Sequence, residues 1–367
     1  MKLNRTQLIE KSLELLKKYQ HETGSFPASP NFDEFRYCFL RDASFCAYAL
    51  LLYGEVERCR KFLEWCHRTI LSQSDKVETI RKKASGSDYI SLNEFLPVRY
   101  ELDGTLKDSD WPNFQIDCYG TWLWCLEEYV KITKDEQILI ELESSVNLTI
   151  SYLKTVWTFA SFDCWEEHQY RRHTSSLACV AGGLASASRL YQDENFGRFS
   201  EAVKKALSDS ITGEGIFPKF LSGEDIDTSF LWLSVPFNVF NSKDATMLAT
   251  LKEIESRLII DNGVYRYPND TYYGGGRWPL LNSFLAWYKI KLGKIEEAEE
   301  LIKWTESVAD ENGFFPENNY DVPLFPEHTQ KWIDKWGAHV TPPLLWTQAM
   351  YLIAQYHLEK GSSKFIG

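Results

Sequence analysis

The chain has 367 residues, 44% of them hydrophobic and 25% charged, which is an ordinary composition for a folded globular protein. Acidic residues number 52 and basic residues 40, so the formal net charge is -12. This balance excludes a disordered tail protein and argues against a nucleic-acid partner, because such binding depends on basic surface that neutralises phosphates. Aromatic residues make up 15% of the chain. That share suits a carbohydrate site, in which flat sugar faces lie against rings and carboxylates act on the bond.

The N-terminal segment places Ile9, Leu13 and Leu16 on one face at helical spacing, which predicts a first helix rather than a signal peptide. No stretch approaches the roughly 20 apolar residues of a membrane-spanning helix. All eight cysteines lie in the first half, and none forms a C-x-x-C motif. An even count permits disulfides, but most cysteines fall on apolar helical faces, so we expect buried free thiols and a cytoplasmic location. The seven histidines are scattered, and we expect neither a metal nor a cofactor.

Helical periodicity dominates the chain. The predicted helices, in chain order, cover residues 6–19, 42–53, 55–72, 115–131, 136–156, 173–191, 194–208, 228–236, 243–257, 278–291, 294–308 and 343–359. A weak repeat pairs them as hairpins, because residues 52–65 (LYGEVERCRKFLEW) resemble residues 291–304 (KLGKIEEAEELIKW), each with a glycine between two helices. About twelve helices arranged this way predict six pairs stacked in a ring or a solenoid within one domain.

Long, dissimilar loops join one predicted hairpin to the next. They cover residues 20–41, 73–114, 157–172, 209–227, 258–277 and 309–342. Long loops in a compact fold are usually functional, and these six contain nearly every cluster of polar and aromatic residues. We therefore expect the site where the loops converge.

The first two clusters combine charge with aromatic rings. Residues 35–42 read FRYCFLRD, in which Arg41 and Asp42 can hold neighbouring hydroxyls of a polyol. They can equally be a surface charge and a helix N-cap. Residues 110–120 read DWPNFQIDCYG. A tryptophan before a proline does not fit well inside a helix, so Trp111 is predicted in a loop, where protein or ligand covers its ring.

Carboxylates distinguish the third cluster, residues 162–167 (FDCWEE), which precede RRHTSS. Apolar contact and like charge can raise the pKa of Glu166 or Glu167, as a general acid at neutral pH requires. The alternative is a solvated acidic loop around a buried Trp165.

The last two clusters lie in the C-terminal half. Residues 263–276 (GVYRYPNDTYYGGG) contain turn residues and glycines, with Arg266 among tyrosines as a candidate sugar contact. Residues 313–318 read GFFPEN, in which Glu317 can act as a general base for water or serve as a capping or ion-paired residue.

Taken together and in order, these segments resemble glycoside hydrolase family 15, the glucoamylase family. The matching segments are RYCFLRDASF, WPNFQIDCYG, FDCWEE followed by RRHTSS, RYPNDTYYGGG followed by RWPLL, and GFFPEN followed by PPLLWTQA. They run from about residue 35 to residue 350, nearly the whole chain. The resemblance implies an all-α fold, an (α/α)6 barrel, as one catalytic domain over residues 1–367, which agrees with the predicted helices.

The resemblance also implies an inverting reaction with Glu166 as general acid and Glu317 as general base. Inversion needs the two carboxyl groups about 6.5–9.5 Å apart, and only a closed ring of hairpins brings residues so distant in sequence face to face. The implied substrate-binding residues are Arg41, Asp42 and Arg266 at the non-reducing-end sugar, with Glu167, Trp111, Trp165 and Trp346 as further contacts.

Three positions depart from the family pattern. Phe39 stands where a tryptophan is common, and Phe35 stands where an aromatic hydroxyl is often found. Asn318 follows Glu317 where a glutamine is usual. These departures put the linkage preference and the substrate in doubt more than they put the predicted activity in doubt.

The sequence thus predicts a cytoplasmic, exo-acting α-glucoside hydrolase that releases glucose from short α-1,4- or α-1,6-linked oligosaccharides. We expect a small-molecule substrate as its partner, with no nucleic acid and no membrane, and the oligomeric state stays open. Neither an N-terminal β-sandwich nor a carbohydrate-binding module is expected. The alternatives are a trehalase of the same family, a non-catalytic sugar-sensing regulatory module, and a helical scaffold that binds protein.

Overall fold

The structure of the protein is a computed structural model that describes residues 2–106, 111–338 and 342–363. The α-helices in these ranges are α1 (Arg5–Tyr19), α2 (Leu40–Leu52), α3 (Val56–Leu71), α4 (Ser74–Gly86), α5 (Asp117–Thr133), α6 (Gln137–Val156), α7 (Thr174–Tyr191), α8 (Glu194–Asp209), α9 (Ala245–Leu258), α10 (Pro279–Leu292), α11 (Ile295–Ser307), α12 (Pro326–Trp336) and α13 (Leu345–Ser363). Short 3-10 helices are η1 (Asp33–Phe35), η2 (Leu92–Glu94), η3 (Thr228–Leu233) and η4 (Tyr272–Gly274). Two-residue strands are β1 (Cys38–Phe39), β2 (Arg99–Tyr100), β3 (Ile259–Ile260) and β4 (Gly263–Val264).

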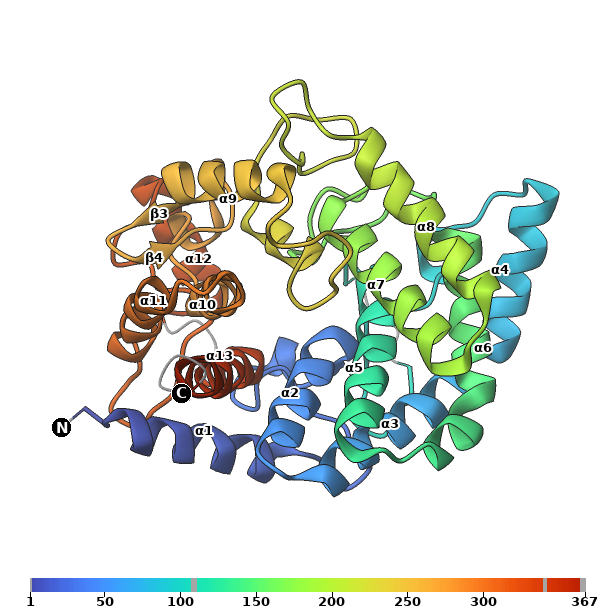
Figure 1. Cartoon of the computed structure of the whole chain (residues 1–367), viewed down its shortest axis with the longest axis horizontal. Helices are drawn as coiled ribbons and strands as arrows, with labels where there is room; N and C mark the ends of the chain where they lie inside the picture. Colours follow the sequence, from blue (N-terminus) through green and yellow to red (C-terminus); the bar gives the residue numbers. More distant parts are fainter. Residues whose placement is uncertain (1, 107–110, 339–341, 364–367) are drawn as a thin grey trace.

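Six segments form a closed inner ring. Each contacts the next in the order α2, α5, α7, η3, α10 and α13, and α13 contacts α2 again. The helices α1, α3, α6, α8, α9 and α11 pack against this ring from outside. The blue α1 lies below the red α13 in Figure 1 and contacts it, so the first helix packs against the last. The predicted all-α fold, an (α/α)6 barrel, is confirmed.

Inner and outer helices differ in how their sequences distribute apolar residues. In α2, every residue except the last is buried, as a helix surrounded by other helices requires. The outer α3 buries a stripe that includes Phe62, Leu63 and Cys66 and leaves its charged face to solvent. Gly54 and Gly293 adopt φ of 86° and 81° in the short turns after α2 and α10. This left-handed backbone favours glycine and accounts for the repeat seen in the sequence.

One predicted α-helix is wrong in type. Within the predicted helix 228–236, residues Thr228–Leu233 form the 3-10 helix η3. Pro236 lies shortly after and has no backbone N–H with which to continue a helix. The fully buried segment still occupies its position in the inner ring.

Two helices were missed inside regions predicted to be loops. The helix α4 lies within 73–114 and buries only Val77 and Ile80, so its sequence lacks a clear apolar stripe. The helix α12 lies within 309–342 and has no buried residue. Its Trp332 and Trp336 are half-buried, so α12 lies on the surface rather than in the barrel wall.

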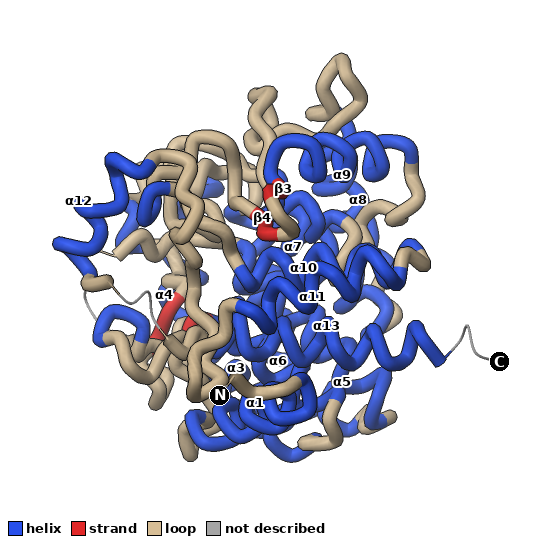
Figure 2. Tube along the Cα trace, turned by 90° about the vertical axis from the view of Figure 1, so that its left-hand side faces the viewer, coloured by secondary structure: helices blue, strands red, loops and turns tan. Residues whose placement is uncertain are grey.

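The long connections gather at one end of the barrel. Short turns join α2, α5, α7 and α10 to the outer helix that follows each of them, whereas the long loops return from outer to inner segments. In Figure 2 the loops, together with α12, lie mainly on the left, and the C-terminal end of α13 points the other way. The N-terminal ends of inner segments therefore face the loop-bearing end.

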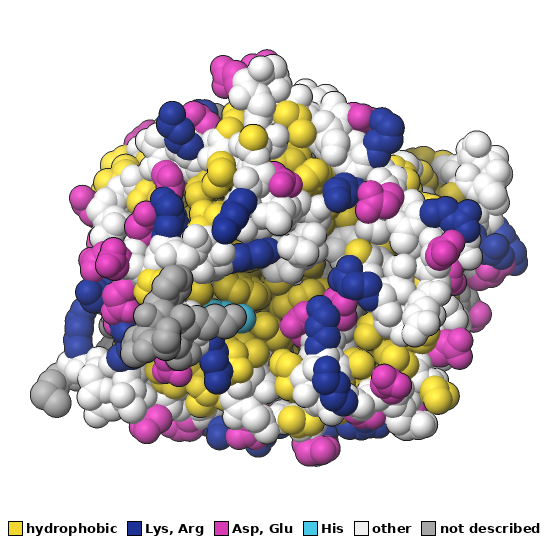
Figure 3. Space-filling view, viewed as in Figure 1, with side chains coloured by type: hydrophobic (Ala, Val, Ile, Leu, Met, Phe, Trp, Pro, Cys, Tyr) yellow, Lys and Arg dark blue, Asp and Glu magenta, His cyan; other side chains and the backbone are white. Residues whose placement is uncertain are grey.

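The opposite end of the barrel faces the viewer in Figure 3, where hydrophobic side chains line a central hollow with Lys and Arg near its edge.

All eight cysteines are buried and free, as expected. Among the described residues, none of the helices combines the length and the apolar character needed to cross a bilayer.

Candidate active site

A cavity of about 570 Å³ lies among the loops, at the N-terminal ends of inner helices. Five of the six long loops contribute to its lining, together with the first residues of α2 and α13. All nine residues singled out from the sequence line it: Arg41, Asp42, Trp111, Trp165, Glu166, Glu167, Arg266, Glu317 and Trp346. Asp110, the first residue of the DWPNFQIDCYG motif, lies outside the described residues. The loops thus converge as the sequence predicted.

The cavity has a floor of aromatic rings. Trp346 stacks on Phe45 with ring centroids 5.7 Å apart. Phe45 in turn contacts Phe284 at 5.3 Å, and Trp232 lies 5.7 Å from Phe284 and 6.0 Å from Trp346. These four buried side chains come from α2, η3, α10 and α13. They fill the inside of the barrel beneath the cavity.

The loop that carries Glu166 is a tight turn built around a buried aspartate. One Asp163 carboxylate oxygen accepts hydrogen bonds from the backbone N–H groups of Trp165 (3.0 Å) and Glu167 (2.8 Å). The Glu166 N–H donates to the Asp163 carbonyl oxygen at 3.0 Å. Glu166 itself has φ of 68°, a left-handed conformation that is uncommon for a residue other than glycine. The turn therefore fixes the direction in which the Glu166 side chain projects from the backbone.

Glu166 is half-buried against rings and near two arginines. Removal from water raises its pKa to about 7, while the charge of Arg41 and a hydrogen bond from Trp111 act in the opposite direction. The Trp111 Nε1–H donates to Glu166 Oε1 at 3.0 Å. A carboxyl group with this pKa retains its proton for a substantial part of the time at neutral pH.

Glu317 lies on the other side of the cavity, on a loop held to its neighbour by backbone. Arg277 and Asn319 exchange two backbone hydrogen bonds of 2.7 and 2.8 Å, which fix the segment next to Glu317. The side chain is 8% exposed, and the Tyr272 hydroxyl donates to its Oε2 at 2.8 Å. Burial raises the pKa of Glu317 to about 7, and the charge of Glu166 adds to that increase.

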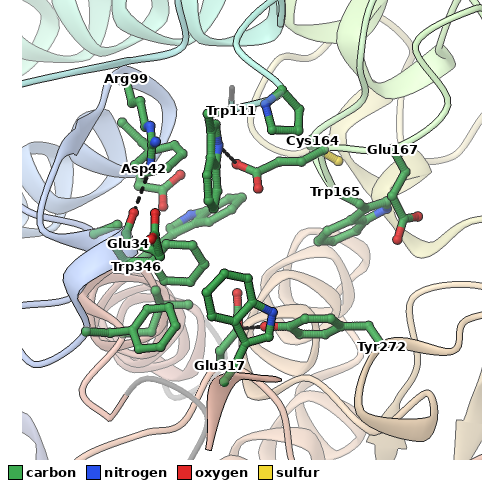
Figure 4. Close-up of a pocket in the computed structure, with 18 of the residues that line it drawn as sticks. Glu34, Asp42, Arg99, Trp111, Cys164, Trp165, Glu167, Tyr272, Glu317 and Trp346 are labelled. Atoms are coloured by element: carbon green, nitrogen blue, oxygen red, sulfur yellow. Dashed lines mark hydrogen bonds between the residues drawn. The ribbon is translucent and has the colours of Figure 1, made fainter. Parts of the chain in front are cut away.

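Figure 4 shows the two sides of the cavity. A dashed line starts at Trp111 on one side of the pocket, and another joins Tyr272 to Glu317 on the other side. The acceptor of the Trp111 hydrogen bond is the Glu166 carboxyl group. Both carboxyl groups therefore face one cavity, with open space between the elements that carry them.

Arg41 and Asp42 begin α2 and lie at the cavity wall. Arg41 donates to Asp117 Oδ2 at 2.9 Å and to Gln115 Oε1 at 2.8 Å, and its Nε lies 3.2 Å from Asp42 Oδ1. Its guanidinium carbon also lies 5.1 Å from the centre of the Trp346 ring. Burial raises the pKa of Asp42 to about 6, while the charge of Arg41 lowers it. The ion pair is buried, so both groups are held in fixed positions.

Arg266 is fixed by a second buried carboxylate. Asp270 accepts two hydrogen bonds from its guanidinium group, at 2.7 and 2.5 Å. The remaining side of Arg266 reaches Glu167 Oε1 at 3.4 Å. The Glu167 carboxylate also accepts a hydrogen bond from the Tyr267 hydroxyl. These contacts place one cation and one partly exposed carboxylate side by side at the cavity.

The predicted tryptophans differ in their surroundings. Trp165 donates from Nε1 to Asp227 Oδ2 at 3.0 Å and lies 5.4 Å from the Trp278 ring. Trp111 stands in a loop, as predicted, with the Arg99 guanidinium 3.9 Å from its ring centre. Protein therefore covers part of the Trp111 ring, and the rest lines the cavity.

Several lining residues were missed by sequence reasoning. Tyr272 was part of a quoted motif, but only the fold shows that its hydroxyl reaches Glu317. Arg99 comes to the cavity because β2 pairs with β1, opposite Phe39. Trp332 and Trp336, which follow GFFPEN in the fifth cluster of the sequence, line the cavity from α12, a helix that was not predicted. Tyr272, Trp332 and Trp336 thus stood in aromatic clusters of the sequence, whereas Arg99 had no such signal, and in every case the contact itself depends on the fold.

A barrel of six helical hairpins with two raised-pKa carboxyl groups and buried arginine–aspartate pairs at its loop end is the architecture of a glycosidase. The chain belongs to glycosyl hydrolases family 15, whose family model matches residues 5–362. This confirms the resemblance found in the sequence.

Two curated relatives define the comparison further. The isomaltose glucohydrolase of Kribbella flavida is 29% identical over 357 residues, which cover 95% of this chain and 91% of that protein. Trehalase 1 of Sulfolobus acidocaldarius is 24% identical over 283 residues, or 75% of this chain and 49% of the trehalase.

Solved structures agree with the fold. A wild-type glycosidase superposes with a TM-score of 0.92 at 28% identity, covering 97% of this chain and 99% of that one. A variant of a glycosidase solved in complex with glucose gives the same TM-score at 27% identity and the same coverage. A bacterial glucoamylase complexed with acarbose, at 19% identity and a TM-score of 0.75 over 96% of this chain and 55% of that one, supports the fold alone.

Proposed function

We propose that this glycosidase is an exo-acting, inverting α-glucoside hydrolase that releases glucose from the non-reducing end of short α-1,4- or α-1,6-linked oligosaccharides. The observation that carries the proposal is the placement of Glu166 and Glu317 in one cavity, each with a pKa raised to about 7. The aromatic floor supports exo-action, because four packed rings occupy the barrel interior through which a chain would otherwise have to continue.

The two glutamates would divide the reaction between them. Glu166, in its protonated form, gives its proton to the glycosidic oxygen as the bond from that oxygen to the anomeric carbon breaks. Glu317, as carboxylate, removes a proton from the water molecule whose oxygen attacks the anomeric carbon from the opposite face. The departing sugar leaves as an alcohol, and the released glucose has the β configuration.

The raised pKa values suit this division of labour. Because the charge of Glu166 raises the pKa of Glu317, the form in which one of the two carboxyl groups is protonated and the other is ionised is favoured near neutral pH. That singly protonated form is the one that contains an acid and a base at the same time. We expect the separation of the two carboxyl groups to fall within about 6.5–9.5 Å, the range that leaves room for water.

The remaining site residues would bind the sugar. Arg41 and Asp42 offer donors and an acceptor at one wall, and Arg266 offers donors at another. Their buried partners, Asp117 and Asp270, keep both guanidinium groups in place without substrate. Trp111, Trp165 and Trp346 supply apolar faces against which a pyranose ring packs.

The proposal is tested by product analysis on maltose, isomaltose, trehalose and a longer maltodextrin, with the anomer of the first glucose released identified by NMR. Initial β-glucose supports inversion, and initial α-glucose contradicts it. Glu166→Gln and Glu317→Gln are each expected to lower kcat by about 10²- to 10⁴-fold. Glu311→Gln is the matched control, because Glu311 is exposed and lies in the same loop, shortly before Glu317. Near-normal turnover in either site variant rejects the assignment.

A trehalase is the second candidate, favoured by the similarity to Trehalase 1. The same substrate panel separates the two, since a trehalase cleaves trehalose and leaves isomaltose intact. A non-catalytic sugar sensor would bind glucosides without releasing glucose. The presence of both Glu166 and Glu317 in one cavity argues against that reading.

A further inference from the structure

A second cavity of about 580 Å³ lies on the far side of the loop that carries Glu166. Glu166 and Glu167 line both cavities, so this loop is the wall between them. The second cavity is also lined by residues 168–170, by Lys219 and Phe220, and by residues 267–269. It receives the one long loop, 209–227, that does not reach the first cavity.

The Glu167 carboxylate joins the two cavities. Its Oε1 lies 3.4 Å from Arg266, which lines the first cavity, and its Oε2 accepts a hydrogen bond from Tyr267, which lines the second. Figure 4 shows this carboxylate at the edge of the first cavity, beyond Trp165. The Glu167 side chain is 32% exposed, so its carboxylate is accessible at the boundary between the two cavities.

The second cavity has the mixture of rings and neutral polar groups that sugars bind. Tyr170 is 83% exposed, which is unusual for so large a ring, and Phe220 packs edge-on against His168 with centroids 5.2 Å apart. Gln169 and Asn269 add amide donors and acceptors. An exposed ring flanked by amides fits the flat face and the hydroxyls of a pyranose.

Tyr170 is presented by a constrained loop. Ser161 pairs with Arg171 through a backbone bridge, and the Arg171 N–H donates to the His168 carbonyl oxygen at 3.0 Å. Both Glu166 and His168 have left-handed backbone, with φ of 68° and 54°. The loop backbone is therefore held at several points, and it presents the exposed Tyr170 ring at the rim of the cavity.

Charge indicates a neutral ligand. The acidic residues Glu166, Glu167 and Asp225 line the second cavity, whereas Lys219 is its one cation among the described residues. Lys219 is already paired with Asp227 at 3.0 Å and lies 3.3 Å from the Tyr267 ring centre. Phosphorylated or acidic sugars would meet net negative charge, so an uncharged glucose unit is favoured.

We propose that the second cavity binds the distal glucose units of the leaving group, beyond the unit next to the cleaved bond, with Tyr170 as the stacking ring. The site rests on the proposed function, because its ligand is the part of a longer glucoside that projects from the first cavity past Glu167. It would make substrates of three or more units better substrates than disaccharides.

The test compares Tyr170→Ala with Tyr89→Ala, since Tyr89 is 84% exposed and lines neither cavity. For Tyr170→Ala, the ratio of kcat/KM on maltotetraose to kcat/KM on maltose is expected to fall about 2- to 10-fold, the range of a single ring contact. Tyr89→Ala should leave the ratio unchanged. Asn269→Ala tests the polar side of the cavity and should lower the same ratio. An unchanged ratio in both cavity variants, or equal losses on both substrates, overturns the proposal.

A binding measurement separates this proposal from the function on which it rests. In a Glu317→Gln background, which is expected not to consume ligand, calorimetry should show maltotetraose binding weakened about 2- to 10-fold by Tyr170→Ala. Maltose binding should not change. If the wild type hydrolyses no glucoside, the proposed function fails. If hydrolysis occurs but tetrasaccharide affinity is unaffected by Tyr170→Ala, only the second site fails.

Discussion

The loops that hold Glu166 and Glu317 reach similar electrostatic results by different structural means. Glu166 is half-buried, and its direction is set by its own backbone, a left-handed residue in a turn organised by Asp163. Glu317 is buried, and its carboxylate is held by the Tyr272 hydroxyl from another loop. Removal from water raises both pKa values to about 7. The proposed acid thus depends on local folding, whereas the proposed base depends on contacts between loops.

The largest difference between the loops should appear when Asp163 is truncated. Asp163→Ala leaves two backbone N–H groups without their acceptor and removes a buried carboxylate 3.8 Å from Lys219. We expect kcat/KM to fall by about 10²-fold or more, because misplacing a catalytic group by about 1 Å has that effect. The melting temperature should fall too. Steady-state kinetics measure the change in kcat/KM, and a thermal melt measures the change in melting temperature.

Asp103→Ala provides the control, since Asp103 also accepts from a backbone N–H two residues later, at 2.9 Å, but lines neither cavity. It should keep full activity. If Asp163→Ala remains fully active, the turn does not position Glu166 and the contrast between the loops is lost.

Tyr272→Phe should have an intermediate effect, about tenfold on kcat/KM, the consequence of one lost hydrogen bond to a charged group. The phenol hydrogen bond lowers the pKa of Glu317, so its removal raises that pKa. A base must be deprotonated to act, and the acidic limb of the pH profile should therefore move to higher pH. The phenylalanine ring keeps the contacts with Trp332 and Trp278. A change in kcat/KM without movement of the acidic limb would contradict this role.

Trp111→Phe should have the smallest effect, a loss of a few-fold in kcat/KM. The indole N–H lowers the pKa of Glu166, so its loss raises that pKa. The acid must be protonated, and the alkaline limb should therefore extend to higher pH. Tyr272→Phe would narrow the pH profile from the acidic side, and Trp111→Phe would widen it from the alkaline side. Movement of the same limb in both variants would show that the acid and base assignments are not separable.

Local sequence patterns anticipated most of the barrel. The periodicity of buried residues located eleven of the predicted helices, because an apolar stripe or a wholly apolar segment marks each of them. The exceptions are informative. The segment η3 reads as an α-helix until Pro236 is considered, and α12 buries nothing, so no apolar periodicity marks it.

The sequence predicted which residues line the site better than it predicted which side chains those residues contact. Charged residues beside aromatic rings are visible in the sequence, and all nine named residues line the cavity. Partners that lie far apart along the chain are not visible in this way. Tyr272 reaches Glu317 from another loop, and Arg99 reaches Trp111 through pairing of β1 with β2. Such contacts depend on the closure of the whole ring.

The aromatic floor of Phe45, Trp232, Phe284 and Trp346 has a kinetic consequence for an enzyme of the proposed kind. With no rear exit through these rings, the freed monosaccharide must depart by the same mouth that admitted the chain. The shortened chain then has to back out before a new end can enter. Each catalytic cycle would end in complete dissociation, so successive cuts would be spread over many chains instead of proceeding along one.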